Sequence, residues 1–392
     1  MVDLAKRRFL KQGFCGLSVY GVGAIWANAL IGGCSSQHGV QLQAADENGV
    51  KLPAGFRSRI IANSSQPVIS GEEFLWHAAP DGGACFSTDN AGWIYVSNSE
   101  VRSSGGASAL VFSSDGEVVD AYPILENTRN NCAGGATPWG SWLSCEEIDA
   151  GRVWECYPDG QTSAIVRPAL GVFNHEAVAF DEKNLHLYLT EDKTDGCLYR
   201  FTSNQLDRKG FPDLSAGNLE VAIMQNNPVT ESKRVVLDWV AMPDPLAQQQ
   251  ATRYQVPAVM KFNGGEGITY YNEQIIFTTK GDNRVWSYNT KNQQLDILYD
   301  AKESLTPILT GVDNVTVSQT GDIYVAEDGG DLQIVVIDNQ GSIYPLAQLE
   351  GHDSSEITGL AFSPDGRRLY FSSQRGTSGL SESGITYEIQ GF

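Results

Sequence analysis

The apolar residues of this chain gather into short strand-like runs that recur in one order: an alternating run, a turn, a nearly continuous apolar run ending in polar residues, and a third alternating run. The continuous runs are the easiest to align: WIYVSNSE (93–100), SWLSCEE (141–147), LHLYLTED (185–192), QIIFTTKGD (274–282), DIYVAEDGG (322–330) and RLYFSSQ (368–374). Anchored on Tyr95, Leu143, Tyr188, Ile276, Tyr324 and Tyr370, they follow one another at spacings of 48, 45, 88, 48 and 46 residues. Several strands repeated every ~40–50 residues indicate a β-propeller with one blade per repeat. The sequence therefore predicts an all-β, six-bladed β-propeller.

The one double-length spacing contains a polar stretch at about 202–262, which predicts an insertion between blades three and four. Its Pro- and Gln-rich composition favours a surface excursion, with WVAM (239–242) as a short buried anchor, and a lid over the channel mouth is the alternative. The segment GFRSRIIA (55–62) is a candidate for the outer strand that closes the ring with the last blade. We expect a single propeller domain over residues 51–392, preceded by a linker at 35–50.

The first 34 residues have the composition of an export signal rather than of a blade. The basic run from Lys6 to Lys11 precedes an apolar, Gly-rich run from Phe14 to Gly33, and this order is typical of exported proteins. The basic run resembles a twin-arginine signal in which Lys6 replaces one arginine, and the residues before Cys34 resemble a bacterial lipobox. We therefore expect an exported protein of a Gram-negative bacterium, either periplasmic or anchored to the membrane by lipid on Cys34. A retained membrane anchor is the alternative.

Composition narrows the range of partners. The formal charge is −20, from 47 acidic and 27 basic residues, and such a chain would repel the phosphates of nucleic acid. The five cysteines beyond Cys34 cannot all pair with one another, and their spacing does not suggest a disulfide framework. We expect a monomer that binds no nucleic acid.

Carboxylates recur at two positions of the repeat. The first position lies at the start of each first strand and holds Gly82, the 131–135 segment, Glu176, Glu266, Asp313 and Thr358. The second lies at the end of each second strand and holds Glu100, Glu146-Glu147, Glu191-Asp192, Lys280, Glu327-Asp328 and Gln374. A single acidic residue in such a place is usually part of a solvated turn. Acidic residues repeated at the mouth of one channel would repel one another unless a cation neutralised them, so the pattern favours a site for Ca²⁺ or a similar hard cation.

The blade-two segment NCAGGATPWGSWLSCEE (131–147) resembles the signature of the PhoX-type alkaline phosphatases. Further similar segments follow in the same order: FNHEAVAF (173–180), GEGITY (265–270), QIIFTTKGDNRVWSY (274–288), DNVTVSQTGDIYVAEDGG (313–330) and TGLAFSPDGRRLYFSSQ (358–374). The resemblance implies a phosphomonoester hydrolase with Ca²⁺ and Fe³⁺ in the channel mouth, acting on a small phosphoester.

The resemblance also assigns residues. It implies that Cys132 is a thiolate ligand of iron and that Glu176 and Glu266 are carboxylate ligands. Further acidic candidates come from the family pattern and from the second repeat position: Glu146, Glu147, Glu191, Asp313, Glu327 and Asp328. Because His175 and Glu176 are neighbours on one strand, their side chains point to opposite faces, and we expect His175 to pack in the core or to support a ligand rather than to bind metal itself.

Two departures from the family pattern concern the phosphate. Members often carry a basic residue at the position of Gly264, and Asn where this chain has Ile148. Lys280, Arg284 or Arg375 could supply the missing positive charge. No Ser-His-Asp arrangement or phosphate-binding loop is visible, so the metals would carry the chemistry.

Two other functions stay open at this point. One is a calcium-dependent propeller hydrolase of lactones or phosphotriesters, which Cys132 within its motif argues against. The other is a non-catalytic surface propeller in which metal ions only stabilise the fold.

Overall fold

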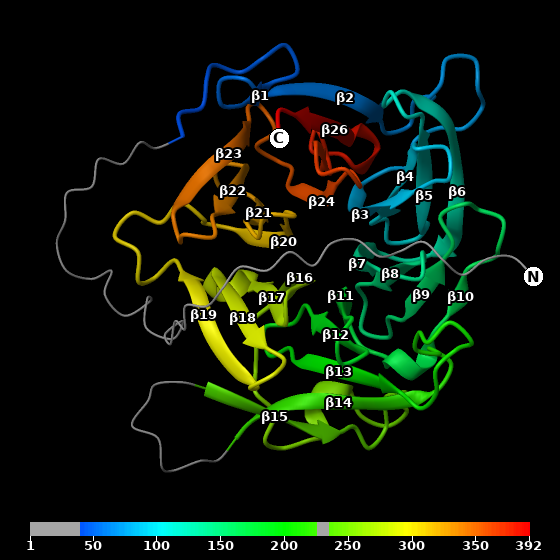
Figure 1. Ribbon diagram of the computed structural model, residues 1–392, viewed down its shortest axis with the longest axis vertical. Helices are drawn as coiled ribbons and strands as arrows, with labels where there is room; N and C mark the ends of the chain where they lie inside the picture. The colour runs from blue at the N-terminus through cyan, green and yellow to red at the C-terminus, as the bar shows by residue number, and fades with distance from the viewer. Residues whose placement is uncertain (1–39, 226–234) are drawn as a thin grey trace, which may run out of the picture. The chain divides into compact units, whose positions relative to one another are not determined.

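The computed structural model describes residues 40–225 and 235–392, and the regular secondary structure within them is almost entirely antiparallel strand (Figure 1). The export signal and Cys34 lie outside the described residues. Among the described residues no helix is long and apolar enough to cross a membrane.

The strands form five sheets, of which three have four strands, one has five and one has nine. The first four-stranded sheet contains β3 (Pro80–Ser87), β4 (Trp93–Ser99), β5 (Gly105–Phe112) and β6 (Val118–Thr128). The second contains β7 (Asn131–Ala136), β8 (Trp142–Glu146), β9 (Val153–Cys156) and β10 (Ile165–Val166). The third contains β24 (Ile357–Phe362), β25 (Arg368–Ser373), β26 (Ile385–Gln390) and the N-terminal β2 (Arg57–Asn63). The five-stranded sheet contains β20 (Val312–Val317), β21 (Ile323–Glu327), β22 (Gln333–Ile337), β23 (Ile343–Leu349) and β1 (Val50–Lys51).

The nine-stranded sheet joins two repeats side by side. One half contains β11 (His175–Asp181), β12 (His186–Glu191), β13 (Leu198–Ser203), β14 (Gly217–Met224) and β15 (Val235–Ala241). The other half contains β19 (Gln294–Asp300), β18 (Arg284–Asn289), β17 (Gln274–Thr279) and β16 (Gly265–Tyr271). Four short 3-10 helices stand in the described loops: η1 (Pro168–Leu170), η2 (Thr252–Tyr254), η3 (Lys280–Asp282) and η4 (Ser381–Ser383).

The first strands of the six repeats meet at the centre of the described fold. Strand β3 contacts β7, which contacts β11, and the series continues through β16, β20 and β24 back to β3. In Figure 1 the sheets stand around this centre, and the arrangement is propeller-like. The repeat read from the sequence therefore corresponds to one inner strand and the strands outside it.

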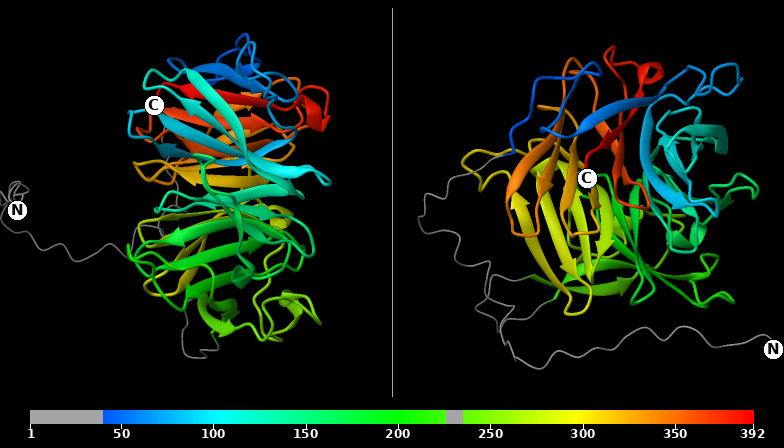
Figure 2. Two further views of the ribbon diagram at one scale, coloured as in Figure 1. Left: turned by 90° about the vertical axis from the view of Figure 1, so that its right-hand side faces the viewer. Right: turned by 45° about the horizontal axis from the view of Figure 1, so that its top comes forward.

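The predicted closing strand is confirmed. Strand β2 pairs antiparallel with β26, and the pairs run from Arg57 opposite Gln390 to Asn63 opposite Ile385. Figure 2 shows β2 lying along the sheet that contains the C-terminal strand. This pairing ties the N-terminal part of the described chain to its last strand, and β2 is the outermost strand of that sheet.

The interval predicted to be an insertion contributes two strands to a sheet. Strand β14 extends the sheet beyond β13, and β15 pairs with β14 on one side and with β19 of the next repeat on the other. Trp239 and Met242 are buried, as the WVAM segment predicted. Further along, Thr252 of η2 accepts a hydrogen bond from the Tyr199 hydroxyl, which ties the interval to the inner part of the sheet.

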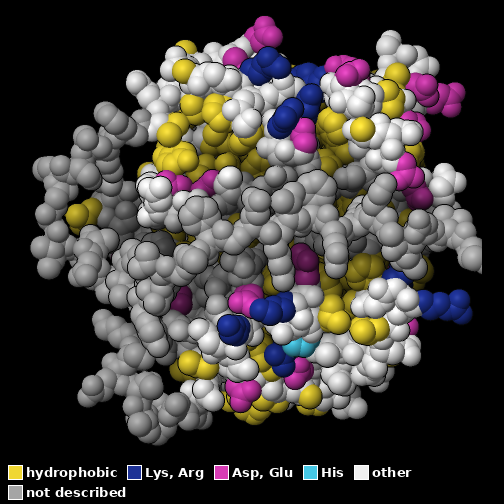
Figure 3. All heavy atoms as spheres, viewed as in Figure 1, with side chains coloured by type: hydrophobic (Ala, Val, Ile, Leu, Met, Phe, Trp, Pro, Cys, Tyr) yellow, Lys and Arg dark blue, Asp and Glu magenta, His cyan; other side chains and the backbone are white. Residues whose placement is uncertain are grey.

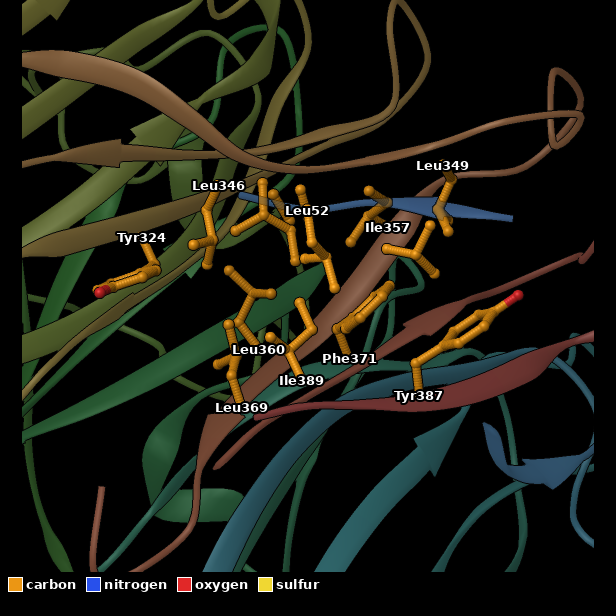
Figure 4. Packing of buried hydrophobic residues seen from close by; sticks show 14 of the residues in the cluster. Leu52, Tyr324, Leu346, Leu349, Ile357, Leu360, Leu369, Phe371, Tyr387 and Ile389 are labelled. Carbon is orange, nitrogen blue, oxygen red and sulfur yellow. The ribbon is translucent and has the colours of Figure 1, made fainter. Parts of the chain in front are cut away.

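The hydrophobic core lies between neighbouring sheets. Figure 4 shows one of its layers, where Tyr324 and Leu346 of one sheet face Leu360 and Phe371 of the next. Because a second strand has a neighbouring sheet on each side, its side chains are buried on both faces. This is why all seven residues of β4 are buried and why these strands read as continuous apolar runs.

Candidate metal centre

A β-bulge near the start of each inner strand turns one side chain out of the regular ladder. In β7, for example, Asn131 pairs with Glu146 but the next pair is Gly134 with Ser144, so the inner strand has one extra residue. The same shift occurs in β3, β11, β16, β20 and β24. Bulges often re-aim side chains beside functional sites. The residues at this position, called the inner set below, are Asp81, Cys132, Glu176, Glu266, Asp313 and Thr358.

The second strand of each repeat supplies another residue near the same place. In all six repeats the outermost pair joins the residue before the inner-set residue to the last residue of the second strand, as in Asn131 with Glu146 and His175 with Glu191. The residue that follows the second strand then begins the next loop. These residues, called the outer set below, are Glu100, Glu147, Asp192, Lys280, Asp328 and Gln374.

Nine side chains of these surroundings form four overlapping groups of possible metal ligands, and within each group the ligand atoms lie within 4.8 Å of one another. The groups are Asp81, Glu100 and Cys132; Cys132, Glu147 and Glu176; Glu176, Glu266 and Asp313; and Asp313, Asp328 and Glu356. Cys132, Glu176 and Asp313 each belong to two groups, so the four groups make one continuous centre. The predicted acidic centre therefore exists in the fold, and one thiol lies within it.

The electrostatics of this centre strongly disfavour ionised carboxyl groups when no metal is bound. Burial and then the charges of Glu266 and Glu147 raise the pKa of Glu176 well above its ordinary value. Burial raises the pKa of Asp313 to about 7 even though Lys280 acts against it, and burial with Glu100 raises the pKa of Glu147 to about 8. A cation placed among these groups would reverse the effect, because it stabilises the charged form.

Two further observations fit bound metal ions. The Glu176 side chain is 1% exposed, yet its Oε2 has no hydrogen-bond partner among the described residues. Its Oε1 accepts a hydrogen bond from the Cys132 thiol at 3.2 Å, and burial raises the pKa of that thiol well above its ordinary value. A buried carboxylate oxygen without a partner is costly unless an ion binds it. Carboxylates suit Ca²⁺, and a thiolate among oxygen ligands suits a transition metal such as iron.

Five of the six residues that directly follow the inner set are glycine or alanine. The residues that follow the inner set are Gly82, Ala133, Ala177, Gly267, Asn314 and Gly359. A Cβ atom on Gly82 would lie 2.5 Å from the Cα atom of Ala133, so neighbouring inner strands approach at a distance that only glycine permits. Beyond this layer the inner strands line a cavity of about 450 Å³.

His175 is a packing residue, as its position on the strand predicted. Its Nε2 lies 3.1 Å from the carbonyl oxygen of Gly171, and its ring lies 3.6 Å from the ring of Phe173 between centroids. Burial lowers the pKa of His175 to about 3, so the ring is neutral.

Three predicted acidic ligands are not brought into the four groups. The Glu146 carboxylate accepts hydrogen bonds from the backbone N–H groups of Arg129 and Arg152. The Glu327 carboxylate accepts them in the same way from Thr310 and Gln333.

The third of these residues, Glu191, is fully buried and held by side chains. It accepts a hydrogen bond from the Tyr199 hydroxyl and forms an ion pair with Arg253. All three residues end a second strand, and strand alternation directs their side chains away from the side on which the outer set lies.

The three basic residues considered for phosphate binding do not all lie at the centre. Arg284 forms ion pairs with Asp282 and Asp300, neither of which belongs to the four groups. An Arg375 guanidinium nitrogen lies 3.5 Å from Glu356 and 4.0 Å from Glu100. Lys280 lies 3.2 Å from Glu266 and 3.1 Å from Asp328. Arg375 and Lys280 therefore contact carboxylates of the centre, whereas the described ion pairs of Arg284 are with carboxylates outside the four groups.

Sequence reasoning missed two members of the groups, Asp81 and Glu356. Asp81 directly precedes Gly82, which had been aligned with Glu176, so the blade-one alignment was displaced by one residue. Glu356 precedes β24 and pairs with Asp328 in an isolated bridge. Glu356 lies two residues before Thr358, and the other repeats hold Ala79, Asn130, Asn174, Gly264 and Gly311 at this position, so no acidic pattern pointed to Glu356.

The described fold is propeller-like, and at its centre it brings together nine possible metal ligands. A profile of the PhoX alkaline phosphatase family matches residues 97–157, 149–304 and 277–376. These segments overlap and span more than half of the chain, so the chain belongs to the PhoX alkaline phosphatase family. Its class is that of the metal-dependent phosphatases.

Solved structures agree on the fold. The chain is similar to Pseudomonas fluorescens PhoX in complex with vanadate, a transition-state analogue, with 15% identity, a TM-score of 0.73 and coverage of 90% of this chain and 98% of that chain. It is less similar to a protein of unknown function from Bacteroides thetaiotaomicron, with 9% identity, a TM-score of 0.51 and coverage of 86% and 76%. No curated protein sequence matches the chain.

Proposed function

We propose that this protein hydrolyses phosphomonoesters at a centre of Ca²⁺ and Fe³⁺ ions held by the four ligand groups. The position of Cys132 is the observation that carries the proposal, because its sulfur atom is shared by two groups whose other members are carboxylates. Bound metal ions would activate an oxygen nucleophile, bind phosphate oxygens and stabilise the leaving oxygen. The ligands would be Asp81, Glu100, Cys132, Glu147, Glu176, Glu266, Asp313, Asp328 and Glu356. Glu146, Glu191 and Glu327 would instead fix the loops around the centre.

The ring of inner strands supports counting the fold as six blades. The nine-stranded sheet would then be two blades joined through β15 and β19, since it has an inner strand at each end. The interval 202–262 would supply the outer strand of blade three and the connection to blade four. Residues 51–392 would form one domain.

The chain's own residues can hold a phosphate at the rim of the centre. The Arg375 side chain is 40% exposed, so its guanidinium is accessible to a substrate as well as to Glu100 and Glu356. Guanidinium groups bind phosphate through two parallel hydrogen bonds. At Gly264, where a basic residue is expected, φ is +71° and a Cβ atom would lie 3.2 Å from the Asp192 carboxylate, so this backbone is built for glycine. We therefore assign phosphate binding to Arg375.

Replacing this arginine should weaken substrate binding without unloading the metals. We expect Arg375→Gln to raise KM roughly 10- to 100-fold, the range of a lost charge-assisted hydrogen bond of about 1.5–3 kcal/mol. Steady-state kinetics and metal analysis of the same samples measure both effects. Arg284→Gln is the matched control and should leave KM unchanged. A fall in metal content in Arg375→Gln would show a structural role instead.

The function itself is tested by metal analysis of protein purified without chelator, combined with a phosphomonoester assay with and without added Ca²⁺. Iron and calcium together with hydrolysis would support the proposal. Calcium without iron, with hydrolysis of a lactone or phosphotriester, would favour the alternative enzyme. Metal without any hydrolysis would favour a binding protein.

We also propose that the protein is exported and that lipid on Cys34 anchors it to the membrane. The basic run, the apolar run and the small residues before Cys34 support this proposal. Cell fractionation tests it, because Cys34→Ala should move the protein from the membrane fraction to the soluble fraction.

A further inference from the structure

Lys280 occupies an unusual place in the metal centre. In the outer set, four of the six repeats supply a carboxylate and one supplies Gln374, whereas the fourth repeat supplies this lysine. A positive charge therefore stands where the pattern of the fold places negative charge.

The contacts of Lys280 are all directed at the centre. Its Nζ lies 3.2 Å from Oε1 of Glu266 and 3.1 Å from Oδ2 of Asp328. Glu266 belongs to the group with Glu176 and Asp313, and Asp328 belongs to the group with Asp313 and Glu356. None of the four groups contains both Glu266 and Asp328, whereas the ammonium of Lys280 contacts both of them.

The backbone beneath this side chain is held in place. The N–H group of Lys280 donates a hydrogen bond to the carbonyl oxygen of Gly264 at 2.8 Å, and that of Gly281 donates one to Asn263 at 2.9 Å. Asn283 then ends η3 in a left-handed conformation, and its side-chain oxygen accepts a hydrogen bond from the N–H of Val312. These bonds fix the point from which the lysine reaches the two carboxylates.

We propose that the ammonium of Lys280 is a built-in cation that takes the place of a metal ion between Glu266 and Asp328. This inference rests on the proposed function, because it presumes that the centre binds metal. An ammonium nitrogen at about 3 Å from two carboxylates offsets half of their charge, whereas Ca²⁺ at about 2.3–2.6 Å offsets all of it; the ammonium cannot dissociate and polarises a bound phosphate less strongly.

The charge of the centre explains what such a cation would achieve. The four groups contain eight carboxylates and one thiol, and Lys280 and Arg375 are the basic side chains that form ion pairs with these carboxylates in the described structure. Lys280 would keep the side of the centre formed by the fourth and fifth repeats neutralised when free calcium is scarce. It would also limit the number of metal ions that the protein binds there.

The test is the number of calcium ions bound per chain, measured by equilibrium dialysis and elemental analysis. We expect Lys280→Glu to bind one more Ca²⁺ per chain than the wild-type protein, because Glu266, Asp328 and the new carboxylate would form a further oxygen site. Lys280→Gln should bind the extra ion at least roughly tenfold more weakly, because it adds no charged ligand. Lys280→Arg keeps the positive charge and should leave the number unchanged.

Lys193→Gln is the matched control. Lys193 forms an ion pair with Asp149, whose side chain is 81% exposed, and neither residue belongs to the four groups. This variant should bind calcium as the wild-type protein does.

Two outcomes would overturn the inference. If Lys280→Glu and Lys280→Gln bind the wild-type number of ions while inhibition by inorganic phosphate weakens, Lys280 is a substrate contact. If both variants lose metal, the lysine only supports the existing ligands. Because the measurement does not use activity, a wild-type protein that binds no metal would instead refute the proposed function.

Discussion

Removing the metal ions should lower the melting temperature much more at pH 8 than at pH 5. Burial raises the pKa of Asp313 to about 7 and, together with Glu100, raises the pKa of Glu147 to about 8 in the metal-free folded protein. In the unfolded chain both carboxyl groups would titrate near pH 4. The folded metal-free state therefore binds more protons than the unfolded state between these values, and its stability falls as pH rises from about 4 to about 8.

Bound metal ions change the sign of this effect. Ligands must be deprotonated to bind a metal ion, so metal binding stabilises the folded protein most at the pH where the metal-free centre is least stable. One pKa unit corresponds to about 1.4 kcal/mol, so the shifts of these two groups correspond to a stability difference of several kcal/mol. We expect a chelator to lower the melting temperature by about 10 °C at pH 8 and by only a few degrees at pH 5.

Calorimetry with and without chelator at the two pH values makes this measurement. Asp313→Asn should flatten the pH dependence of the metal-free protein, because it removes a titrating group from the centre. Asp296→Asn, which alters an exposed residue of β19, should leave the pH dependence unchanged. Equal losses at both pH values, or a metal-free protein more stable at pH 8, would contradict the argument.

The repeat could be read from the sequence because the second strands are buried on both faces. Tyr95, Tyr188 and Tyr370 are fully buried between sheets, and such positions give long apolar runs that align without gaps. The inner strands are rich in glycine and alanine, so they carry a weaker signal, and the bulge at their start is invisible in the sequence. This is why Asp81 was missed in favour of Gly82.

The acidic pairs show a second limit of the sequence. Glu146-Glu147 and Glu327-Asp328 each contain one residue that holds a loop and one that enters the centre. Both residues of each pair are acidic, so residue type does not distinguish the two roles. Only the register of β8 and β21 decides which of the two side chains points into the centre. Sequence could therefore predict an acidic centre but not its membership.

The joined sheet is a third case. The sequence predicts an insertion at 202–262 because this interval interrupts the spacing of the repeats. Strands β14 and β15 nevertheless pair with their neighbours through backbone hydrogen bonds, which do not depend on the repeat pattern.

Net charge alone does not describe the exposed surface either, because basic side chains lie among acidic ones on the face shown in Figure 3.

The second large effect should come from Cys132→Ser. We expect this variant to lose most of its iron, any thiolate-to-iron absorption and at least roughly 100-fold of its phosphatase activity, while calcium content changes less. Cys132 is 8% exposed and belongs to two ligand groups, so its loss would remove a ligand from both. A serine hydroxyl is a harder and weaker ligand that stays protonated at neutral pH unless the metal is strongly acidifying. Elemental analysis, visible absorption spectra and circular dichroism of the same preparation separate loss of iron from loss of fold.

Cys145→Ser supplies the comparison that makes this result interpretable. Cys145 is fully buried, pairs with Val153 across β8 and β9, and packs in the apolar layer with Leu143 and Leu170, outside the four ligand groups. Placing a hydroxyl there should cost stability, about 1–3 kcal/mol for an unsatisfied buried group, but should leave the iron content unchanged. Equal loss of iron in both variants would mean that a general packing defect releases the metal. Normal iron content in Cys132→Ser would show that the thiol is not a ligand of iron and that the carboxylates of the centre hold the iron without it.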